Sequence, residues 1–375
     1  MIHGNSTNFK WQRVVIKVGS ALIAPDRKGV SSRYLLGIAQ FIVRCREMGI
    51  QVVLVSSGSV AAGAHLFPDV DKPSVSVKKA MAAAGQTEMI GIWNNLFDFA
   101  TAQILMTHGD LRDRERYISV KNTIHTLLEN GILPIINEND TVTTDKLRVG
   151  DNDNLSAMVA AASDADVLII CSDINGLYDK NPRTHSDAVL VPEIREISKN
   201  TYAMAGSEAG LLGTGGMRTK VEAAEKATSH GIDTFIINGF SETAFNQLLA
   251  GQNPGTHFFP VAKPMKELVH WMTYTSDAQG EVVVENDFEF DMDIQSELLT
   301  SEAIAEVRGQ FTVGDTVLIT KRDGTKLAKA VSNYSSCLLS FIADQDDDSF
   351  ATDFQSNTGS IISPQNMAIL NNKKF

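Results

Sequence analysis

The sequence predicts an α/β/α sandwich with a mainly parallel central sheet, followed by a small, mostly β domain. Over residues 13–240, short and uniformly apolar segments alternate with helical patterns, as in parallel strands covered by helices on both faces. That pattern breaks after residue 250, and short β-like runs follow. The 375 residues also exceed the roughly 250–300 that one hydrophobic core serves, so we expect two domains.

Composition and charge narrow the class of protein. A hydrophobic content of 43% with 21% charged residues is ordinary for a soluble globular protein. The first residues are polar, no apolar run approaches the roughly 18 residues of a membrane span, and the cysteines (Cys45, Cys171 and Cys337) are too dispersed for a disulfide framework. We therefore expect a cytoplasmic protein with reduced thiols. The net charge of −12 disfavours nucleic acid as the main partner, so a few local cations must meet any anionic substrate.

Six apolar runs predict the strands of the first domain, and the segments between them carry helical periodicity. The expected strands are 13–18, 52–55, 103–106, 132–136, 167–171 and 234–237. One expected helix begins at Ser31-Ser32. The other expected helices span residues 77–99, 115–130, 154–163 and 218–230. Five of these strands stop at Gly, Ser, Asn or Asp, after residues 18, 55, 136, 171 and 237. Ligands of parallel sheets bind beyond the carboxyl ends of the strands, so we expect the active site at that edge.

The domain plan follows from the break in pattern. We predict a catalytic domain over 1–257, a linker over 258–275 and a small β domain over 276–375. Its expected strands are the short apolar runs EVVVEN (281–286), TVLIT (316–320), CLLSFIA (337–343) and GSIIS (359–363).

Two clusters of acids and amides flank one short segment. Asn137–Asp140 follow the strand 132–136, a Thr/Val-rich segment runs to Val149, and Gly150–Asn154 open a helix. Such residues suit turns and helix caps. They also suit the binding of ammonium groups, lysines or metal-bound phosphates, and two clusters around one insertion favour a ligand site with a flap over it.

Candidate phosphate-binding groups lie elsewhere in the chain. The run Gly213–Gly216 precedes a helix, where backbone N–H groups and the helix dipole suit an anion, and Lys220 lies in the first turn. A tight turn is the alternative. Lys17 ends the first strand and is a second candidate, although its ammonium could simply lie in water. The sequence has no GxxxxGK[ST], no HExxH and no GxSxG around Ser57. Lysines, glycine loops and carboxylates remain, which is the set that phosphoryl transfer uses, with Mg²⁺ on the phosphates.

The chain resembles the glutamate 5-kinase (gamma-glutamyl kinase) family of the amino-acid kinase superfamily, with a C-terminal PUA domain. The stretches that carry the resemblance are VVIKVGS, VVLVSSGSVAAG, DRERY, ILPIINEND, GDNDNLSA, SDINGLYDKNPR, LLGTGGMRTK and GIDTFIING. They cover nearly all of residues 13–240, and the resemblance implies the amino-acid-kinase-like fold. The PUA match is weaker, because the segments IQSELLTSE and ISPQNMAIL lack the basic residues common in that module.

The resemblance also implies roles for matching residues. Lys17 and Lys220 neutralise the transferring phosphoryl group, Asp153 orients both lysines, and Gly58 offers a backbone N–H to the reacting group. Ser57, Asp140 and Asn152 bind the substrate. The ATP-binding residues are Lys17, Ser172, Asp173, Thr214, Gly215, Gly216, Met217, Arg218, Thr219 and Lys220. No protein metal ligand is implied, so ATP would carry Mg²⁺.

The implied activity is ATP-dependent phosphorylation of the L-glutamate side-chain carboxylate to L-glutamyl 5-phosphate, the first step of proline biosynthesis. A carboxylate with an ordinary pKa of roughly 4.3 is ionised at neutral pH and needs no general base. The resemblance further implies proline as feedback inhibitor, a homo-oligomer (dimer or tetramer) and a glutamyl-5-phosphate reductase as consumer of the product.

Two other functions remain open at this point. A kinase of this kind could act on another small carboxylic acid. An RNA-binding or RNA-modification accessory protein could act through the PUA-like domain. The net charge of −10 over residues 271–375 disfavours RNA binding.

Overall fold

The chain forms two compact units, Met1–Pro264 and Met265–Phe375. The computed structural model describes residues 11–26, 28–68, 70, 72–143, 152–206, 216–290, 299, 303–343 and 361–370. The division between the units falls inside the stretch 258–275 that the sequence predicts as a linker, and helix α11 (Glu267–Tyr274) forms in its second half.

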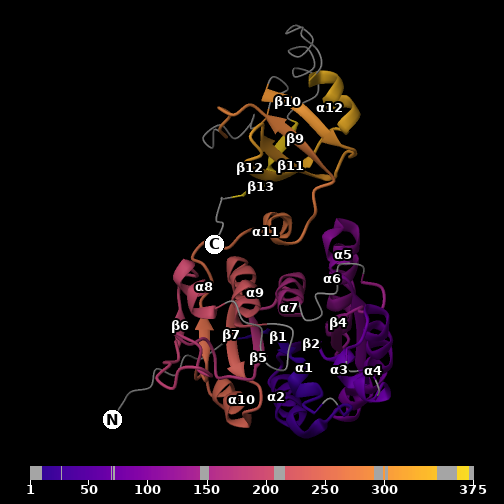
Figure 1. Ribbon diagram of the computed structural model, residues 1–375, viewed down its shortest axis with the longest axis vertical. Coiled ribbons are helices and arrows are strands. Elements are labelled where there is room, and N and C mark those ends of the chain that lie inside the picture. The colour runs from indigo at the N-terminus through magenta and orange to yellow at the C-terminus, as the bar shows by residue number, and fades with distance from the viewer. Residues whose placement is uncertain are drawn as a thin grey trace. The chain divides into compact units, whose positions relative to one another are not determined.

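An eight-stranded sheet is the centre of the first unit (Figure 1). Its order is β3 (Thr101–Met106), β4 (Leu133–Glu138), β2 (Gln51–Ser56), β1 (Arg13–Val18), β5 (Val167–Ser172), β7 (Asp233–Asn238), β8 (Thr256–Phe258) and β6 (Glu193–Ile194). Only the β7–β8 pair is antiparallel. The predicted mainly parallel sheet is confirmed, and all six predicted strands are present.

Helices cover both faces of this sheet. They are α1 (Ser20–Ile23), α2 (Leu35–Glu47), α3 (Ser59–Gly63), α4 (Val75–Asn95), α5 (His108–Arg112), α6 (Arg114–Glu129), α7 (Asn152–Ala162), α8 (Lys199–Ala205), α9 (Met217–Ser229) and α10 (Glu242–Leu249). No helix among the described residues is long and apolar enough to cross a membrane.

Strand β1 shows how the two layers form. Successive side chains of a strand point to opposite faces. Val14, Ile16 and Val18 are buried in one cluster with side chains of α2 and α10. Lys17 points to the other face, where it pairs with α7. Figure 1 shows α2 and α10 on one side of the sheet and α7 and α9 on the other. A lysine in an otherwise apolar strand therefore ends in a polar site instead of in the core.

Two glycines let α3 and α4 pack backbone to backbone. A Cβ on Gly63 would lie 2.1 Å from the carbonyl oxygen of Met81, and one on Gly85 would lie 2.1 Å from that of Ser59. Such distances exclude any side chain, so the two helices touch only because both residues are glycine. This crossing holds the middle of α4 against the carboxyl ends of β2 and β4.

The second unit has a five-stranded, mostly antiparallel sheet and its own core. The order is β10 (Ile304–Gly309), β9 (Gly280–Val284), β11 (Thr316–Lys321), β12 (Lys326–Ser332) and β13 (Ile362–Ile369). The runs EVVVEN and TVLIT supply β9 and β11 as predicted. In the run GSIIS, β13 begins at Ile362, and residues 359 and 360 lie outside the described residues.

One strand prediction is wrong. The run CLLSFIA forms helix α12 (Ser336–Ala343). A short apolar run does not by its period distinguish a strand from a buried helix. Here Ser335 begins the helix, since its hydroxyl accepts a hydrogen bond from Leu338 N and its carbonyl one from Leu339 N. Leu339 and Ile342 then face the core at helical spacing.

Candidate active site

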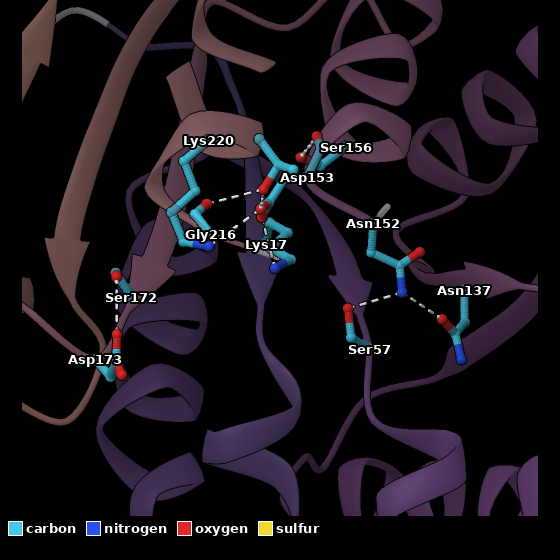
Figure 2. A network of polar contacts seen from close by, with 11 residues as sticks. Lys17, Ser57, Asn137, Asn152, Asp153, Ser156, Ser172, Asp173, Gly216 and Lys220 are labelled. Carbon is cyan, nitrogen blue, oxygen red and sulfur yellow. Dashed lines mark hydrogen bonds and ion pairs between the residues drawn. The ribbon is translucent and has the colours of Figure 1, made fainter. Parts of the chain in front are cut away.

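The candidate site lies at the carboxyl edge of the sheet and has three parts in the order of the strands (Figure 2). Ser172 ends β5, Lys17 lies near the end of β1, and Ser57 follows β2. Asn137 belongs to β4, beyond β2. The predicted gathering of polar strand ends at one edge is therefore confirmed.

The middle part joins three elements. Lys17 Nζ lies 2.6 Å from Asp153 Oδ1, and Lys220 Nζ lies 3.1 Å from Asp153 Oδ2. The three residues come from β1, α7 and α9, and Asp153 is fully buried. Thr219 Oγ1 donates to the same Oδ2 atom at 2.7 Å. One carboxylate thus holds two ammonium groups side by side, with one positive charge left over.

The charges of this group follow from burial and pairing. Burial alone would raise the pKa of Asp153, but the adjacent Lys17 and Lys220 charges and the hydrogen bonds hold that pKa well below its usual range. Burial lowers the pKa of Lys17, and the ion pair with Asp153 opposes that shift. The Asp153 carboxylate is therefore ionised at neutral pH.

The start of α9 brings further predicted residues to the site. Gly216 precedes the helix, Met217 and Arg218 form its first turn, and Thr219 Oγ1 also donates to the carbonyl of Gly216 at 2.9 Å. Arg218 is exposed and lies against Glu222. Thr214 and Gly215 lie outside the described residues.

Ser172 and Asp173 lie on the other side of Lys17 from Ser57 (Figure 2). Ser172 Oγ donates to Asp173 Oδ1 at 3.4 Å, and Asp173 forms an ion pair with Arg183 from the following loop. The neighbouring Cys171 is buried, and burial raises the pKa of its thiol to about 12, so it stays a neutral thiol.

Gly58 forms the backbone bend between β2 and α3. Its φ of +105° is a left-handed conformation that favours glycine, and a Cβ there would lie 3.0 Å from the Cβ of Ile23. Ser57 N donates to the carbonyl of Val18 at 3.0 Å, which ties this bend to the end of β1. Residues 57 and 58 are thereby held next to the strand that carries Lys17.

A cluster of amides lies beside this bend. Asn152 Nδ2 donates to Ser57 Oγ at 2.7 Å and to Asn137 Oδ1 at 3.0 Å. Asn152 Oδ1 is buried with no hydrogen-bond partner among the described residues. A buried acceptor without a partner is costly and indicates a place for a donor, such as a substrate amine.

Asp140 is the second acceptor in this part. Ser59 Oγ donates to its Oδ2 at 2.7 Å. Among the residues that the structure describes, no cation pairs with this carboxylate, and burial raises its pKa despite the Ser59 hydrogen bond. Asp140 therefore differs from Asp153, which already has two cations. A ligand ammonium group would supply the missing charge.

Among the described residues, side-chain contacts do not join all the predicted ones: the structure joins Lys17, Thr219 and Lys220 through Asp153, and it joins Ser57 to Asn152, whereas Arg218 is exposed and pairs with Glu222. It adds Ser59, which holds Asp140, and Gln86 and Asn137, which support Asn152. Asn137 lies in the acid/amide cluster that the sequence singled out, whereas nothing in the pattern of α4 marks Gln86. Most of the predicted flap (141–149) lies outside the described residues, because the structure does not describe residues 144–151. The described residues contain no group of three His, Cys, Asp or Glu side chains that could hold a metal ion.

Comparison with known proteins defines the class. The model of the amino acid kinase family matches residues 12–238. Among solved structures, UMP kinase from Bacillus anthracis aligns with a TM-score of 0.48 at 14% identity, over 67% of this chain and 97% of that one. An isopentenyl phosphate kinase aligns with a TM-score of 0.47 at 16% identity, over 66% and 99%. The chain, with its parallel sheet and paired lysines, belongs to the amino acid kinase family.

Relatives over nearly the full length narrow the family further. "Glutamate 5-kinase 1" of Pseudoalteromonas translucida is 62% identical and covers 96% of this chain and 98% of its own length. The glutamate 5-kinases of Idiomarina loihiensis and Salinibacter ruber are 52% and 43% identical, over 92% and 88% of this chain. The aligned regions cover 93% and 89% of the lengths of those two relatives. Within the amino acid kinases, the chain groups with the glutamate 5-kinases.

Proposed function

We propose that this protein transfers the γ-phosphoryl group of ATP to the side-chain carboxylate of L-glutamate, giving L-glutamyl 5-phosphate for proline biosynthesis. The observation that carries the proposal is the order of the three parts along the sheet edge. Ser172 and Asp173 serve the nucleotide, Lys17 and Lys220 the phosphoryl group, and Ser57, Asp140 and Asn152 the amino acid. The substrates thus meet at the lysines.

The residues fit an in-line phosphoryl transfer. The attacking carboxylate is ionised at neutral pH, so no general base is needed. Both reactants are anionic, and the two ammonium groups offset their repulsion and the charge that develops on the transferring group. Asp153 keeps both lysines in place before the substrates arrive, so little reorganisation accompanies the reaction.

The amino-acid end of the site selects an amine. Among the described residues, the Asp140 carboxylate has no cation partner and Asn152 Oδ1 has no hydrogen-bond partner, and both acceptors suit the α-ammonium group by charge and hydrogen bonding. We further propose that Mg²⁺ enters on the ATP phosphates, where it neutralises charge, since phosphate-bound Mg²⁺ needs few protein ligands.

Trapping of the acyl phosphate with hydroxylamine tests the proposal. Wild-type protein with ATP, Mg²⁺ and L-glutamate should yield glutamyl hydroxamate, and omission of any one of the three should abolish it. Aspartate, glutarate and N-acetylglutamate serve as alternative acceptors. Product from one of these acids but none from glutamate would refute the assignment.

The regulation, oligomeric state, product transfer, location and second domain are inferred from the family. We propose feedback inhibition by proline, a homodimer or homotetramer, transfer of the labile product to a reductase, a cytoplasmic location and a PUA-like second unit. Titration of the activity with proline tests the first, and light scattering at working concentration tests the second. An activity unaffected by millimolar proline would refute the feedback proposal.

A further inference from the structure

Three buried side-chain amides form a chain behind the amino-acid end of the site. Asn137 Nδ2 donates to Gln86 Oε1 at 2.8 Å, and Asn152 Nδ2 donates to Asn137 Oδ1 at 3.0 Å. Gln86, Asn137 and Asn152 are all less than 10% exposed. They come from α4, β4 and α7, so the chain links three elements that are far apart in the sequence.

A backbone group fixes the direction of this chain. Glu138 N donates to Asn137 Oδ1 at 2.8 Å, and a backbone N–H can only donate. The atom that it meets must therefore be the Asn137 oxygen, which leaves Nδ2 to face Gln86. Gln86 must then present its oxygen. On the other side, Asn152 must present its nitrogen to Asn137.

The last amide is thereby turned with its oxygen free. Asn152 Nδ2 is occupied by Ser57 Oγ and Asn137 Oδ1, and the buried Asn152 Oδ1 has no hydrogen-bond partner among the described residues. If the Asn152 amide were flipped, its oxygen would face the Asn137 oxygen, and its NH₂ group would face the ligand. The substrate α-ammonium would then meet a donor in place of an acceptor.

Gln86 reaches Asn137 because of the tight helix crossing. It is the residue after Gly85, whose Cα lies against the backbone of α3 at Ser59 and Gly63. That contact fixes the position of the Gln86 backbone relative to α3. Because α4 is packed tightly against α3, the Gln86 side chain can move less than a glutamine on a helix without such packing.

We propose that Gln86 is a positioning residue for substrate recognition: by accepting from Asn137 Nδ2, it acts together with the Glu138 N–H to hold the Asn137 oxygen toward Asn152, and this keeps the Asn152 oxygen toward the substrate α-amine. This inference rests on the proposed function, because it takes glutamate as the substrate. Gln86 needs no contact with substrate or ATP for this role. A glutamine that only fills space in the core would affect stability but not the discrimination of the amine.

Substitutions of Gln86 distinguish a role in positioning Asn152 from a role in core packing. Gln86→Met keeps the length of the side chain but removes the acceptor, so KM for glutamate should rise by about fivefold to tenfold, the value of one hydrogen bond. KM for ATP should stay unchanged. Gln86→Glu keeps an acceptor oxygen in either protonation state and should restore most of the loss. Gln86→Ser, too short to reach Asn137, repeats the test if Gln86→Met does not fold.

A double-mutant cycle and an amine-free substrate give the decisive readouts. If Gln86 acts through Asn152, Gln86→Met should have no further effect on KM in an Asn152→Ala background. The preference for glutamate over glutarate should also fall in Gln86→Met, since glutarate lacks the amine. Additive effects, or equal losses for both acids, would overturn the role of Gln86. Wild-type protein that phosphorylates another acid but not glutamate would instead overturn the proposed function, and this inference with it.

Discussion

At the scale of single residues, two carboxylates of the site differ in what surrounds them. Asp153 lies between two lysines, and its pKa is held well below the usual range. A depressed pKa means that its contribution to stability is complete above about pH 4 and is lost only as the pH falls further. Asp140 is partly buried, accepts a hydrogen bond from Ser59 and has no cation partner among the described residues, and desolvation raises its pKa. The first carboxylate is therefore ion-paired within the protein, whereas the second has no cation partner among the described residues.

Removal of Lys220 should abolish most of the turnover. Lys220→Ala leaves Asp153 paired with Lys17 but removes one of the two charges at the phosphoryl group, so we expect kcat to fall by about 10³-fold. Fixed-time hydroxamate assays at saturating substrate concentrations measure kcat. Lys226→Ala, at the other end of the same helix, is the control and should behave like the wild type. A kcat for Lys220→Ala near that of the control would contradict the assignment.

The raised pKa of Asp140 predicts a pH dependence of glutamate binding. As the pH falls, Asp140 takes up a proton earlier than an exposed aspartate and loses the charge that attracts the α-ammonium, so KM for glutamate should rise. Asp140→Asn should have a high KM at neutral pH. That KM should change with pH only through the substrate carboxylate, whose ordinary pKa is roughly 4.3. Parallel KM profiles for both proteins would show that Asp140 does not bind the amine.

The sequence pattern predicts which residues belong to the candidate site, but it does not predict which of them contact each other. Lys17 is recognisable because it is a lysine within an apolar strand, and the acid/amide clusters are recognisable because one of them directly follows an apolar strand. The pairing of Lys17 with Asp153 and Lys220 spans distant parts of the chain, and only the family resemblance joined them beforehand. Gln86 gave no signal, because a glutamine in a helix is ordinary until its tertiary partner is known.

At the scale of elements, the strands were the most predictable part, since uninterrupted apolar runs have few alternatives in a buried parallel sheet. The run CLLSFIA (337–343) shows the limit of that reasoning, because a short apolar run packs equally well as a helix. The α3–α4 crossing was also invisible in the sequence. It depends on Gly63 and Gly85, and neither lies in a turn.

That crossing gives a matched pair of substitutions in one helix. Gly85→Ala would place a methyl group against the backbone of α3, so we expect a loss of about 1–3 kcal/mol in the free energy of unfolding. Gly91→Ala, also in α4, has nothing within 4 Å of its Cβ and should stabilise by up to about 1 kcal/mol. Urea denaturation of both variants measures the difference. Equal stabilities would show that the crossing is not tight.

At the scale of the whole molecule, chemistry and charge are divided between the two units. All described residues of the candidate site lie in the first unit, and the second has a separate hydrophobic core. The acidic second unit offers no concentration of lysine and arginine for nucleic acid.

A chain that ends at Pro264 should therefore keep the kinase reaction. We expect its kcat with glutamate and ATP to stay within about one order of magnitude of the full chain, because no described site residue is lost. The hydroxamate assay on both proteins, with circular dichroism as a check of folding, measures this. A folded but inactive first unit would show that residues 265–375 complete the site.

The strand order of the sheet also sets how long a substrate must be. Neighbouring strands lie about 4.8 Å apart, and β2 pairs with β1, so backbone hydrogen bonds fix the spacing between Ser57, which follows β2, and Lys17 on β1. An aspartate held by its amine would present its carboxylate about 1 Å short of the phosphoryl group, and a misplacement of that size lowers the rate by roughly 10²-fold. We therefore expect the sheet to contribute to the preference for glutamate over aspartate, which is shorter by one methylene group.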